Sequence, residues 1–207
     1  MLTTPSITHW SELTFLVVDV EGNGHKPHEI IELASVPIRS GSIQNDANQW
    51  LFRPIKSVTQ RATDLHGITN EVLANKPTFQ ELAPTIHSAL GDEILIGHNV
   101  HIDYQLIKKQ IPQWEPLLVL DTIKLAKAVA PTLKSYALSS LISEFIMSDL
   151  PPGSRHRAMY DAVATAKLFL ILVQKLDQDG QLTLATLAEI GTSPSDSFFS
   201  RAQGGLF

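Results

Sequence analysis

The spacing of the apolar residues changes along this chain, and this change limits the folds open to it. In the first quarter the apolar residues form short runs rich in β-branched side chains, which are typical of strands. We expect strands at 14–18, 29–38 and 49–52, with a hairpin turn at Gly41-Ser42. Farther along, apolar residues spaced three and four apart alternate with short apolar runs. An antiparallel meander followed by alternating strands and helices predicts a layered α/β domain.

The rest of the chain is predicted to combine helices with two more strands. Apolar runs at 93–97 and 117–120 have the length of buried strands. Helical spacing is expected to start at or near Thr69, Thr78, His101, Asp121 or Thr122, Leu138 and Ala158. Pro151-Pro152-Gly153 predicts a loop across 149–155. The Ser- and Gly-rich stretch 192–205 is predicted to be a flexible tail.

The composition excludes several classes of protein. With 207 residues, of which 43% are hydrophobic, the chain is expected to fold as one domain rather than stay disordered. No apolar run approaches the ~20 residues that cross a bilayer, and no secretory signal is visible at the N-terminus. The chain has no cysteine, which excludes disulfides, thiolate zinc sites and cysteine nucleophiles. These features predict a cytoplasmic protein without a membrane partner.

Charge is spread unevenly along the sequence. The net charge of −5 divides into −6 for residues 1–103, +4 for 104–175 and −3 for 176–207. A protein that coats nucleic acid is usually basic throughout, and this chain is not. The pattern fits a carboxylate-rich site with a positive margin, or else an ordinary solvated surface. The lysines of the positive segment that we considered for the margin are Lys108, Lys109, Lys124, Lys127 and Lys134.

Two acidic residues follow the first predicted strand. Asp19 and Glu21 are two positions apart, and side chains at i and i+2 of a strand share a face. Two neighbouring carboxylates repel each other unless a positive charge lies between them, and hard oxygen ligands suit Mg²⁺ or Mn²⁺. The alternative interpretation is a solvated strand end.

Two later segments place acids and histidines beside helix starts. In the segment 97–103, Asp103 falls in the first turn of a predicted helix, where the helix dipole favours an acid. In the segment 155–161, His156 precedes Asp161 by five residues, and a loop histidine near a carboxylate can take a proton from water. Each segment alone also fits an ordinary helix start or a surface histidine.

Taken together, the three motifs resemble the DnaQ-like 3′→5′ exonucleases of the DEDDh type, a family named for four acidic residues and a histidine. The pattern here is Asp19-x-Glu21, His98-Asn99-x-x-x-Asp103 and His156-x-x-x-x-Asp161. The segments 30–34, 65–69, 121–122 and 131–136 also look like the family. The resemblance spans about 15–176, and its details are most similar to bacterial proofreading subunits and to exonuclease domains attached to polymerases or helicases.

The resemblance implies a fold, a domain division and a set of catalytic residues. The fold is an α/β, ribonuclease H-like domain with a mixed five-stranded sheet and helices on both faces. The exonuclease domain occupies 13–178, between an N-terminal extension at 1–12 and a partly flexible C-terminal extension at 179–207. Two divalent cations, Mg²⁺ or Mn²⁺, are held by four carboxylates, and His156 is the general base. The implied metal ligands are Asp19, Glu21, Asp103 and Asp161.

The resemblance also suggests residues that meet the substrate. The family usually follows its first acidic pair with two threonines and a glycine, whereas Gly22-Asn23-Gly24 follows here. This departure alters the loop that touches the terminal nucleotide, so it bears on substrate preference. Arginine suits phosphate through its bidentate geometry. The candidate substrate-binding residues are Gly22, Asn23, His66, His98, Asn99, Arg155 and Arg157, with a structural turn as the alternative for His66.

The predicted function is hydrolysis of single-stranded 3′ ends, with DNA favoured, to nucleoside 5′-monophosphates, in proofreading or repair. An RNA-trimming exonuclease of the same fold is an alternative, because no residue in the sequence indicates whether the protein contacts a 2′-hydroxyl. A catalytically silent nucleic-acid-binding adaptor is a further alternative, against which the five intact catalytic positions argue. A zinc hydrolase is disfavoured, since the histidines lack a spacing such as His-Glu-x-x-His.

A partner protein is suggested by the end of the chain. Gln203, Leu206 and Phe207 are similar to the short peptides by which bacterial replication proteins bind the sliding clamp. Two apolar side chains would enter a pocket while the glutamine hydrogen-bonds at its rim. A frayed tail, or a tail folded on the domain itself, is the alternative. A polymerase or sliding-clamp partner is therefore expected alongside nucleic acid.

Overall fold

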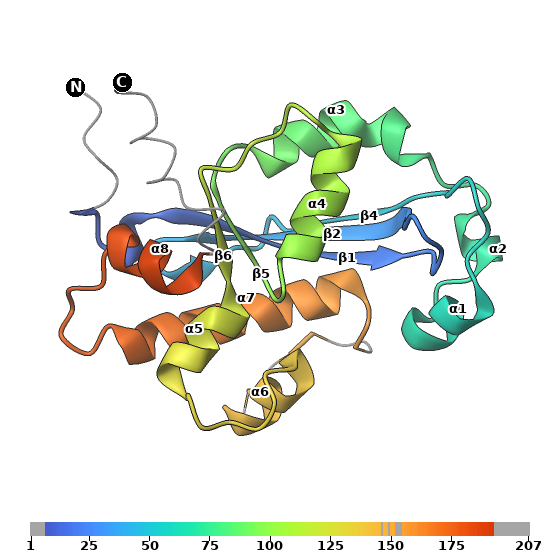
Figure 1. Ribbon diagram of the computed structural model, residues 1–207. Helices are drawn as coiled ribbons and strands as arrows, with labels where there is room; N and C mark the ends of the chain where they lie inside the picture. The colour runs from blue at the N-terminus through green and yellow to red at the C-terminus, as the bar shows by residue number, and fades with distance from the viewer. Residues whose placement is uncertain (1–6, 146, 149, 152–154, 193–207) are drawn as a thin grey trace, which may run out of the picture.

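A single mixed β-sheet forms the centre of the molecule in the computed structural model, which describes residues 7–145, 147–148, 150–151 and 155–192 (Figure 1). The strands are β1 (Thr14–Gly22), β2 (Ile30–Arg39), β3 (Ser42–Ile43), β4 (Asn48–Leu51), β5 (Ile94–Gly97) and β6 (Leu118–Asp121). Their order is β3-β2-β1-β5-β6, and β4 also pairs with β2. The pairs made by β2 are antiparallel, whereas β1–β5 and β5–β6 are parallel. Because β3 and β4 share one edge of β2, the six strands fill five positions, and the predicted mixed sheet is confirmed.

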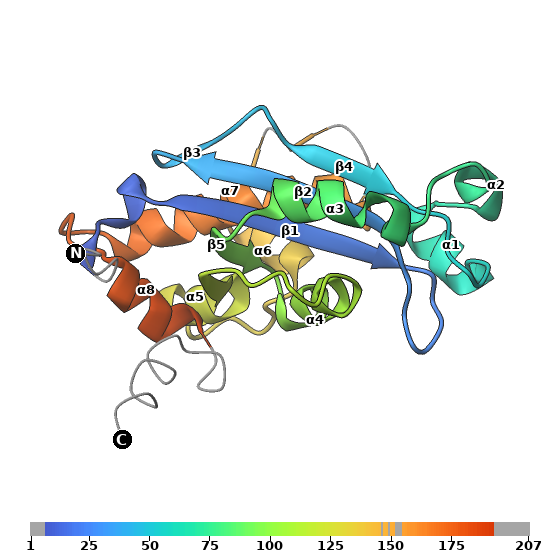
Figure 2. The same ribbon diagram turned by 90° about the horizontal axis from the view of Figure 1, so that it is seen from above.

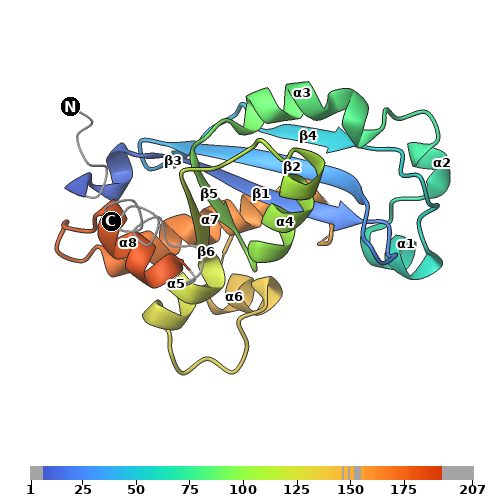
Figure 3. The same ribbon diagram turned by 45° about the horizontal axis from the view of Figure 1, so that its top comes forward.

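Helices cover both faces of this sheet, as predicted (Figures 2 and 3). They are η2 (Trp10–Glu12), α1 (Gln60–His66), α2 (Asn70–Leu73), α3 (Phe79–Leu90), α4 (His101–Gln110), α5 (Thr122–Val129), α6 (Leu138–Glu144), α7 (Ala158–Leu176) and α8 (Leu184–Gly191). Phe15 and Val17 of β1 pack with α5, α7 and α8, whereas Leu16 and Val18 pack with α3 and α4. Side chains alternate along a strand, so consecutive residues of β1 serve opposite faces.

The pair α1 and α2 closes one end of the sheet, beyond the end of β1 and the start of β2 (Figure 1). A separate apolar cluster holds them there through Ile31, Val58, Ala62, Ile68 and Leu73. None of the helices in the described ranges is both long and apolar enough to span a membrane.

The first hairpin differs by one residue from the prediction. Its turn is formed by Ser40 and Gly41, with φ of 49° and 66°, whereas the sequence suggested Gly41-Ser42. Two consecutive positive φ angles make the tight turn that matches the twist of the flanking strands. Ser42 therefore already belongs to β3 and pairs with Arg39.

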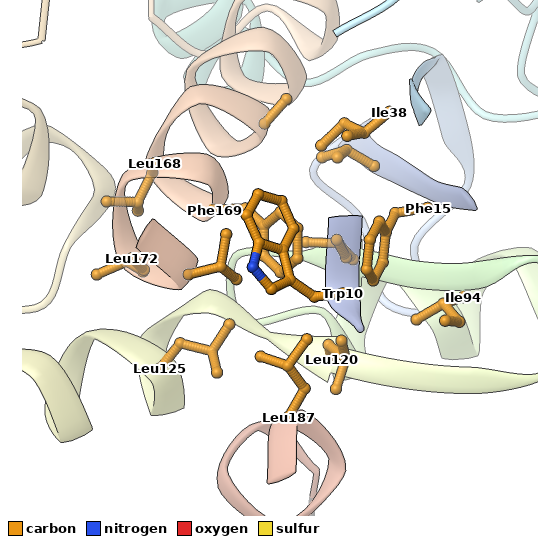
Figure 4. Packing of buried hydrophobic residues seen from close by; sticks show 14 of the residues in the cluster. Trp10, Phe15, Ile38, Ile94, Leu120, Leu125, Leu168, Phe169, Leu172 and Leu187 are labelled. Carbon is orange, nitrogen blue, oxygen red and sulfur yellow. The ribbon is translucent and has the colours of Figure 1, made fainter. Parts of the chain in front are cut away.

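Helix α8 was not predicted, and it joins the N-terminal segment at the end of the sheet away from α1 and α2. The backbone of Trp10 donates to the carbonyl of Leu182, and that of Leu184 donates to Thr8. The Trp10 side chain lies among Phe15, Phe169, Leu172 and Leu187 in the main core cluster (Figure 4). Trp10, Leu182, Leu184 and Leu187 from the two predicted extensions are thus part of the core, while the division at 13 and 178 stays a prediction.

Two expected loops fall partly or wholly outside the described residues. Of the loop predicted at 149–155, residues 150, 151 and 155 are described and have no regular secondary structure. The predicted tail at 192–205, and the clamp-binding residues Gln203, Leu206 and Phe207, lie outside the described part apart from Thr192.

Candidate active site

Strand β1 supplies two carboxylates to the α7 face of the sheet. Asp19 and Glu21 continue the series begun by Phe15 and Val17, which pack against α7. The i, i+2 relation predicted from the sequence therefore holds. Glu21 is 9% exposed and lies opposite Glu32 of β2 in the strand register.

Helix α4 supplies the third carboxylate. Asp103 lies in its first turn, and its Oδ1 accepts a hydrogen bond of 3.0 Å from the backbone N–H of Val20. Val20 stands between Asp19 and Glu21, so this bond fixes the start of α4 against the acidic end of β1. Asp103 is 8% exposed.

Helix α7 supplies the fourth carboxylate together with the histidine. Oδ2 of Asp161, in the first turn of α7, accepts a 2.8 Å hydrogen bond from the backbone N–H of His156. His156 has a φ of 63°, which few non-glycine residues adopt, and such conformations concentrate at functional sites. One potential ligand atom each from Glu21, His156 and Asp161 lies within 4.8 Å of the other two. Among the described residues, this is the one group of three that meets so tight a limit.

Burial raises the pKa values of all four carboxylates, and repulsion from neighbouring acidic residues adds to the effect. Burial raises the pKa of Glu21 to about 8, and the charges of Asp161, Glu32 and Asp103 add to the effect. Burial likewise raises the pKa of Asp103 to about 7, against the hydrogen bond from Val20. For Asp19 the pKa rises well above its ordinary value through burial and then through Asp103 and Glu21. The pKa of Asp161 is raised mainly by burial, although the His156 backbone opposes this.

These carboxylates fit a divalent cation. Hard oxygen donors suit Mg²⁺ and Mn²⁺, and a bound cation offsets the repulsion that otherwise favours protonation. The group formed by Glu21, His156 and Asp161 is a candidate cation-binding group, with Asp19 and Asp103 beside it.

His98 and Asn99, which follow β5, form hydrogen bonds with residues at the end of β6 and the start of α5. His98 Nδ1 lies 2.9 Å from the Thr122 hydroxyl, and burial lowers its pKa. The backbone N–H of Asn99, whose φ is 62°, donates to Asp121 Oδ1 at 3.1 Å. The same Asp121 oxygen accepts from Ile123 and caps α5, as the sequence suggested.

The loop after β1 is tied to the protein itself. Asn23 is 0% exposed, and its side-chain nitrogen donates to Glu29 Oε1 and to the Lys56 carbonyl. Its side-chain oxygen accepts from the backbone N–H groups of His25 and Glu29. The Asn23 side chain therefore uses its donors and its acceptor within the protein, and a contact between Asn23 and a nucleotide stays a prediction. Gly22, at a register shift between β1 and β2, is half-buried.

The glycine that follows is the position at which this loop keeps the family pattern. Gly24 has a φ of 82°, and a Cβ there would lie 2.2 Å from the Thr59 hydroxyl. The Thr59 backbone in turn donates to the Asn23 carbonyl. The segment Gly22-Asn23-Gly24 is thus shaped to lie against the start of α1.

The His66 side chain stabilises the turn that follows α1. It is 2% exposed, its Nδ1 accepts from the Ile68 backbone at 3.0 Å, and burial lowers its pKa. Gly67 ends α1 in the left-handed conformation with a φ of 73°. These contacts match the structural alternative given for His66.

The two arginines that flank His156 have different surroundings. Arg155 is exposed. Arg157 is bound by Glu32: its Nη2 donates to Oε1 at 2.7 Å, and its Nε donates to Oε2 at 3.1 Å. Two of its guanidinium nitrogens are therefore bound by a carboxylate, and a contact between Arg157 and phosphate stays a prediction.

Glu32 itself was not predicted as part of the site. Glu32 lies in a run of apolar residues, and its ion-pair partner Arg157 is 125 residues away in the sequence. Its proximity to Glu21, Asp19 and Asp161 is visible only in the fold.

Two of the lysines considered as a positive margin are used within the fold. Lys108 donates to the Trp114 carbonyl and pairs with Glu115. The Lys127 ammonium lies 5.5 Å from the centre of the Tyr136 ring.

A mixed sheet of this order, with helices on both faces and carboxylates from β1, α4 and α7 near the end of the central strand, defines a ribonuclease H-like protein with a candidate acidic active site. The sequence profile of the exonuclease family (RNase_T) matches residues 16–169. The chain belongs to this exonuclease family, as the sequence motifs predicted.

Relatives support the same assignment. The chain is 33% identical over 169 residues to DNA polymerase III subunit epsilon of Aquifex aeolicus, covering 79% of this chain and 82% of that protein. It is 32% identical over 188 residues to the PolC-type DNA polymerase III of Thermotoga maritima, covering 87% of this chain. It is 33% identical to the 3′-5′ exonuclease DinG of Bacillus subtilis, covering 85% of this chain. The chain spans only 13% of the PolC-type protein and 19% of DinG.

Solved structures agree with the fold. Exonuclease X in complex with 5′ overhanging duplex DNA superposes with a TM-score of 0.70 at 27% identity, covering 86% of this chain and 99% of that one. E. coli exonuclease I in complex with a dA16 oligonucleotide gives a TM-score of 0.68 at 18% identity, covering 80% of this chain and 42% of that one. The second similarity concerns the fold alone.

Proposed function

We propose that this protein is a 3′→5′ exonuclease that depends on divalent cations and trims single-stranded DNA ends. The observation that carries the proposal is the meeting of four carboxylates with raised pKa values beside His156. Membership of the exonuclease family supplies the reaction class. Strongly raised carboxylate pKa values at one edge of a sheet are typical of a functional site rather than a structural one.

The four carboxylates would hold two cations, Mg²⁺ or Mn²⁺. Such cations, when bound, supply positive charge for the attacking and leaving oxygens of an in-line displacement. Asp103 and Asp161 are fixed by backbone N–H groups, and Asp19 and Glu21 are fixed by their strand. The protein therefore holds its donors ready before a ligand arrives, which reduces the reorganisation needed during the reaction.

His156 is the proposed general base. A ring nitrogen of this exposed residue accepts the proton of the attacking water, while the backbone of the same residue stays bound to Asp161. The water oxygen attacks the terminal phosphorus, and the bond to the 3′-oxygen of the preceding nucleotide breaks. The products are a nucleoside 5′-monophosphate and a strand shorter by one nucleotide.

DNA is the favoured substrate because of the relatives. Exonuclease X was solved with DNA, and other relatives are named as DNA polymerases. The loop that departs from the family pattern is occupied by α1 and Glu29. Contact with the terminal nucleotide is therefore left to other parts of the edge, such as the exposed Arg155.

The test uses three end-labelled substrates: single-stranded DNA, duplex DNA with a 3′ mismatch, and RNA. Each is incubated with Mg²⁺, with Mn²⁺ or with a chelator. The proposal predicts mononucleotide release from single-stranded DNA that the chelator abolishes. Faster release from RNA would favour the exoribonuclease alternative, and binding without release in either metal would favour a silent adaptor.

A polymerase is the proposed protein partner. The Aquifex aeolicus relative, most of whose length is covered, is named as a polymerase subunit. The sliding-clamp contact through Gln203, Leu206 and Phe207 stays a prediction. It is tested by titrating a peptide of residues 200–207 against a bacterial clamp, with Leu206→Ala and Phe207→Ala as the control. Absence of binding at high micromolar clamp would remove it.

A further inference from the structure

A group of hydrogen bonds around Glu32 joins β2 to the start of α7. Glu32 is 0% exposed, yet it is a carboxylate in the middle of a strand. Its two oxygens accept four hydrogen bonds: two from Arg157, one of 2.9 Å from the Ala158 backbone and one of 2.6 Å from the Gln49 amide. Burial raises the pKa of Glu32, but these donors outweigh burial and hold that pKa below its ordinary value. A buried carboxylate with this many donors stays charged.

Glu32 takes the place of a missing helix cap. The N-cap residue of α7 is Arg157, and its side chain makes no capping hydrogen bond. The N–H of Ala158, the first residue of the helix, is bound instead by Glu32 from β2. A negative charge at this position also interacts favourably with the helix dipole. The first turn of α7, which carries Asp161, is thus anchored to the sheet.

This anchor joins both halves of the candidate cation site. On its own strand Glu32 lies opposite Glu21, and through Arg157 it holds the residue next to His156. The ligand atoms of Glu21, His156 and Asp161 meet within 4.8 Å because β1, β2 and α7 keep this relation. Releasing the start of α7 would let His156, whose φ of 63° is unfavourable, relax away from Glu21.

The anchor also has an electrostatic disadvantage that a purely structural contact would avoid. The charge of Glu32 adds to the repulsion felt by Asp19, Glu21 and Asp161. A neutral amide at this position would cap the helix without this repulsion, but it would not accept hydrogen bonds from both nitrogens of Arg157. Arg157 also lies near enough to Glu21 for its positive charge to lower the pKa of Glu21.

We propose that Glu32 and Arg157 are positioning residues, which hold the His156–Asp161 segment against β1 so that the cation site is formed. Neither residue needs to touch the cations or the substrate. The inference rests on the proposed function, because the geometry that it protects is the catalytic one.

The discriminating variant is Arg157→Met, tested by calorimetric titration of the metal-free protein with Mn²⁺. Removing a positive charge beside an acidic site would, by charge alone, tighten Mn²⁺ binding. Removing a positioning residue loosens the site, and second-layer substitutions of this kind weaken metal binding by about 10–100-fold. We expect weaker binding by at least about tenfold. An affinity equal to or tighter than that of the wild type would overturn the inference.

Two milder substitutions keep the inference testable if Arg157→Met does not fold. Arg157→Lys keeps a positive partner for Glu32 but loses the two-point contact, so it is expected to fold and still bind Mn²⁺ more weakly. Glu32→Gln keeps the side-chain shape and is expected to lower kcat by about 10–100-fold, with KM for the DNA strand changed by less than about twofold. The control is Asp177→Asn, which removes a carboxylate bound to Trp10 and Leu182 at the other end of α7 and should leave Mn²⁺ affinity and kcat unchanged.

The outcomes separate the inference from the proposed function. If the wild type releases no nucleotide from DNA or RNA but Arg157→Met still weakens Mn²⁺ binding, the function fails and the positioning role stands. If the wild type cleaves DNA while the Arg157 and Glu32 variants match it in both Mn²⁺ affinity and kcat, the positioning role fails and the function stands. A wild type that binds no Mn²⁺ overturns both.

Discussion

The two ends of α7 are both held by carboxylates, but the charges are balanced at one end only. At the C-terminal end Asp177 accepts from the Trp10 indole at 2.7 Å, from the Leu182 backbone at 2.8 Å and from His9 at 2.9 Å. Burial raises its pKa, but these donors outweigh burial and lower it. At the N-terminal end, burial and mutual repulsion raise the pKa values of Asp161 and its neighbours.

The helix of 19 residues separates these ends by about 28 Å. The C-terminal end joins the first and last described segments of the chain, and Asp177 accepts hydrogen bonds from His9, Trp10 and Leu182 there. Near the N-terminal end of α7, the hydrogen-bond donors of the protein do not offset the burial and repulsion of the four carboxylates, so their pKa values stay raised. Local conflicts of this kind are expected at functional sites and lower stability there. The comparison therefore predicts that substitutions at one end change activity, while those at the other end change stability alone.

The largest expected effect is on activity at the acidic end. Asp19→Asn should fold and lose nuclease activity by roughly 10⁴-fold or more, because loss of charge stabilisation removes several kcal/mol of transition-state binding. The measurement is mononucleotide release from end-labelled single-stranded DNA in Mg²⁺. Turnover close to that of the wild type would show that Asp19 is not a ligand.

The next effect concerns the base. His156→Ala should lower kcat by about 10²–10⁴-fold, the usual contribution of a general base, while Mn²⁺ affinity falls much less. Single-turnover kinetics and calorimetry on the same preparation separate the two quantities. Full activity of this variant at neutral pH would remove His156 from the mechanism.

A smaller effect is expected on the stability of the metal-free protein. Because the pKa of Glu21 is raised to about 8, the folded state takes up a proton more readily than the unfolded state. Stability is then highest below the ordinary pKa near 4.5 and is lost as the pH rises towards about 8. Glu21→Gln should therefore stabilise the metal-free protein by about 1–3 kcal/mol at pH 8 and abolish activity.

Urea denaturation in a chelator across pH 5–9 measures this dependence. For Asp177 the sign is opposite, because a lowered pKa contributes stability above the ordinary value and loses it only in acid. Asp177→Asn should thus destabilise the protein at neutral pH and leave kcat unchanged. Equal effects of the two substitutions on stability would break the comparison between the ends of α7.

Much of this arrangement was predictable because its signals are local. Helix starts were predicted at or near His101 and Ala158, and α4 and α7 begin at these residues. The i, i+2 acids of β1 and the first-turn acids of α4 and α7 follow from periodicity and the helix dipole. Their convergence was predicted by resemblance to a family, not by spacing.

The remainder depends on contacts between distant residues. Helix α8 was missed because its eight residues form a short apolar stretch that is stabilised by packing against α5 and β6. The side chain of Asn23 looked available for substrate, yet its amide is used by Glu29 and Lys56. Glu32 looked like a polar residue on a strand, and only the fold brings Arg157 to it.

The most direct test of the unbalanced N-terminal end is the number of protons released when Mn²⁺ binds at pH 7. Carboxylates with pKa values raised to about 7 and about 8 are partly protonated there, and a cation must displace those protons. Calorimetric titration in buffers of different ionisation enthalpy should show net proton release in the wild type and in Asp177→Asn, and less release in Glu21→Gln. Binding without proton release would contradict the claim that these carboxylates await a cation.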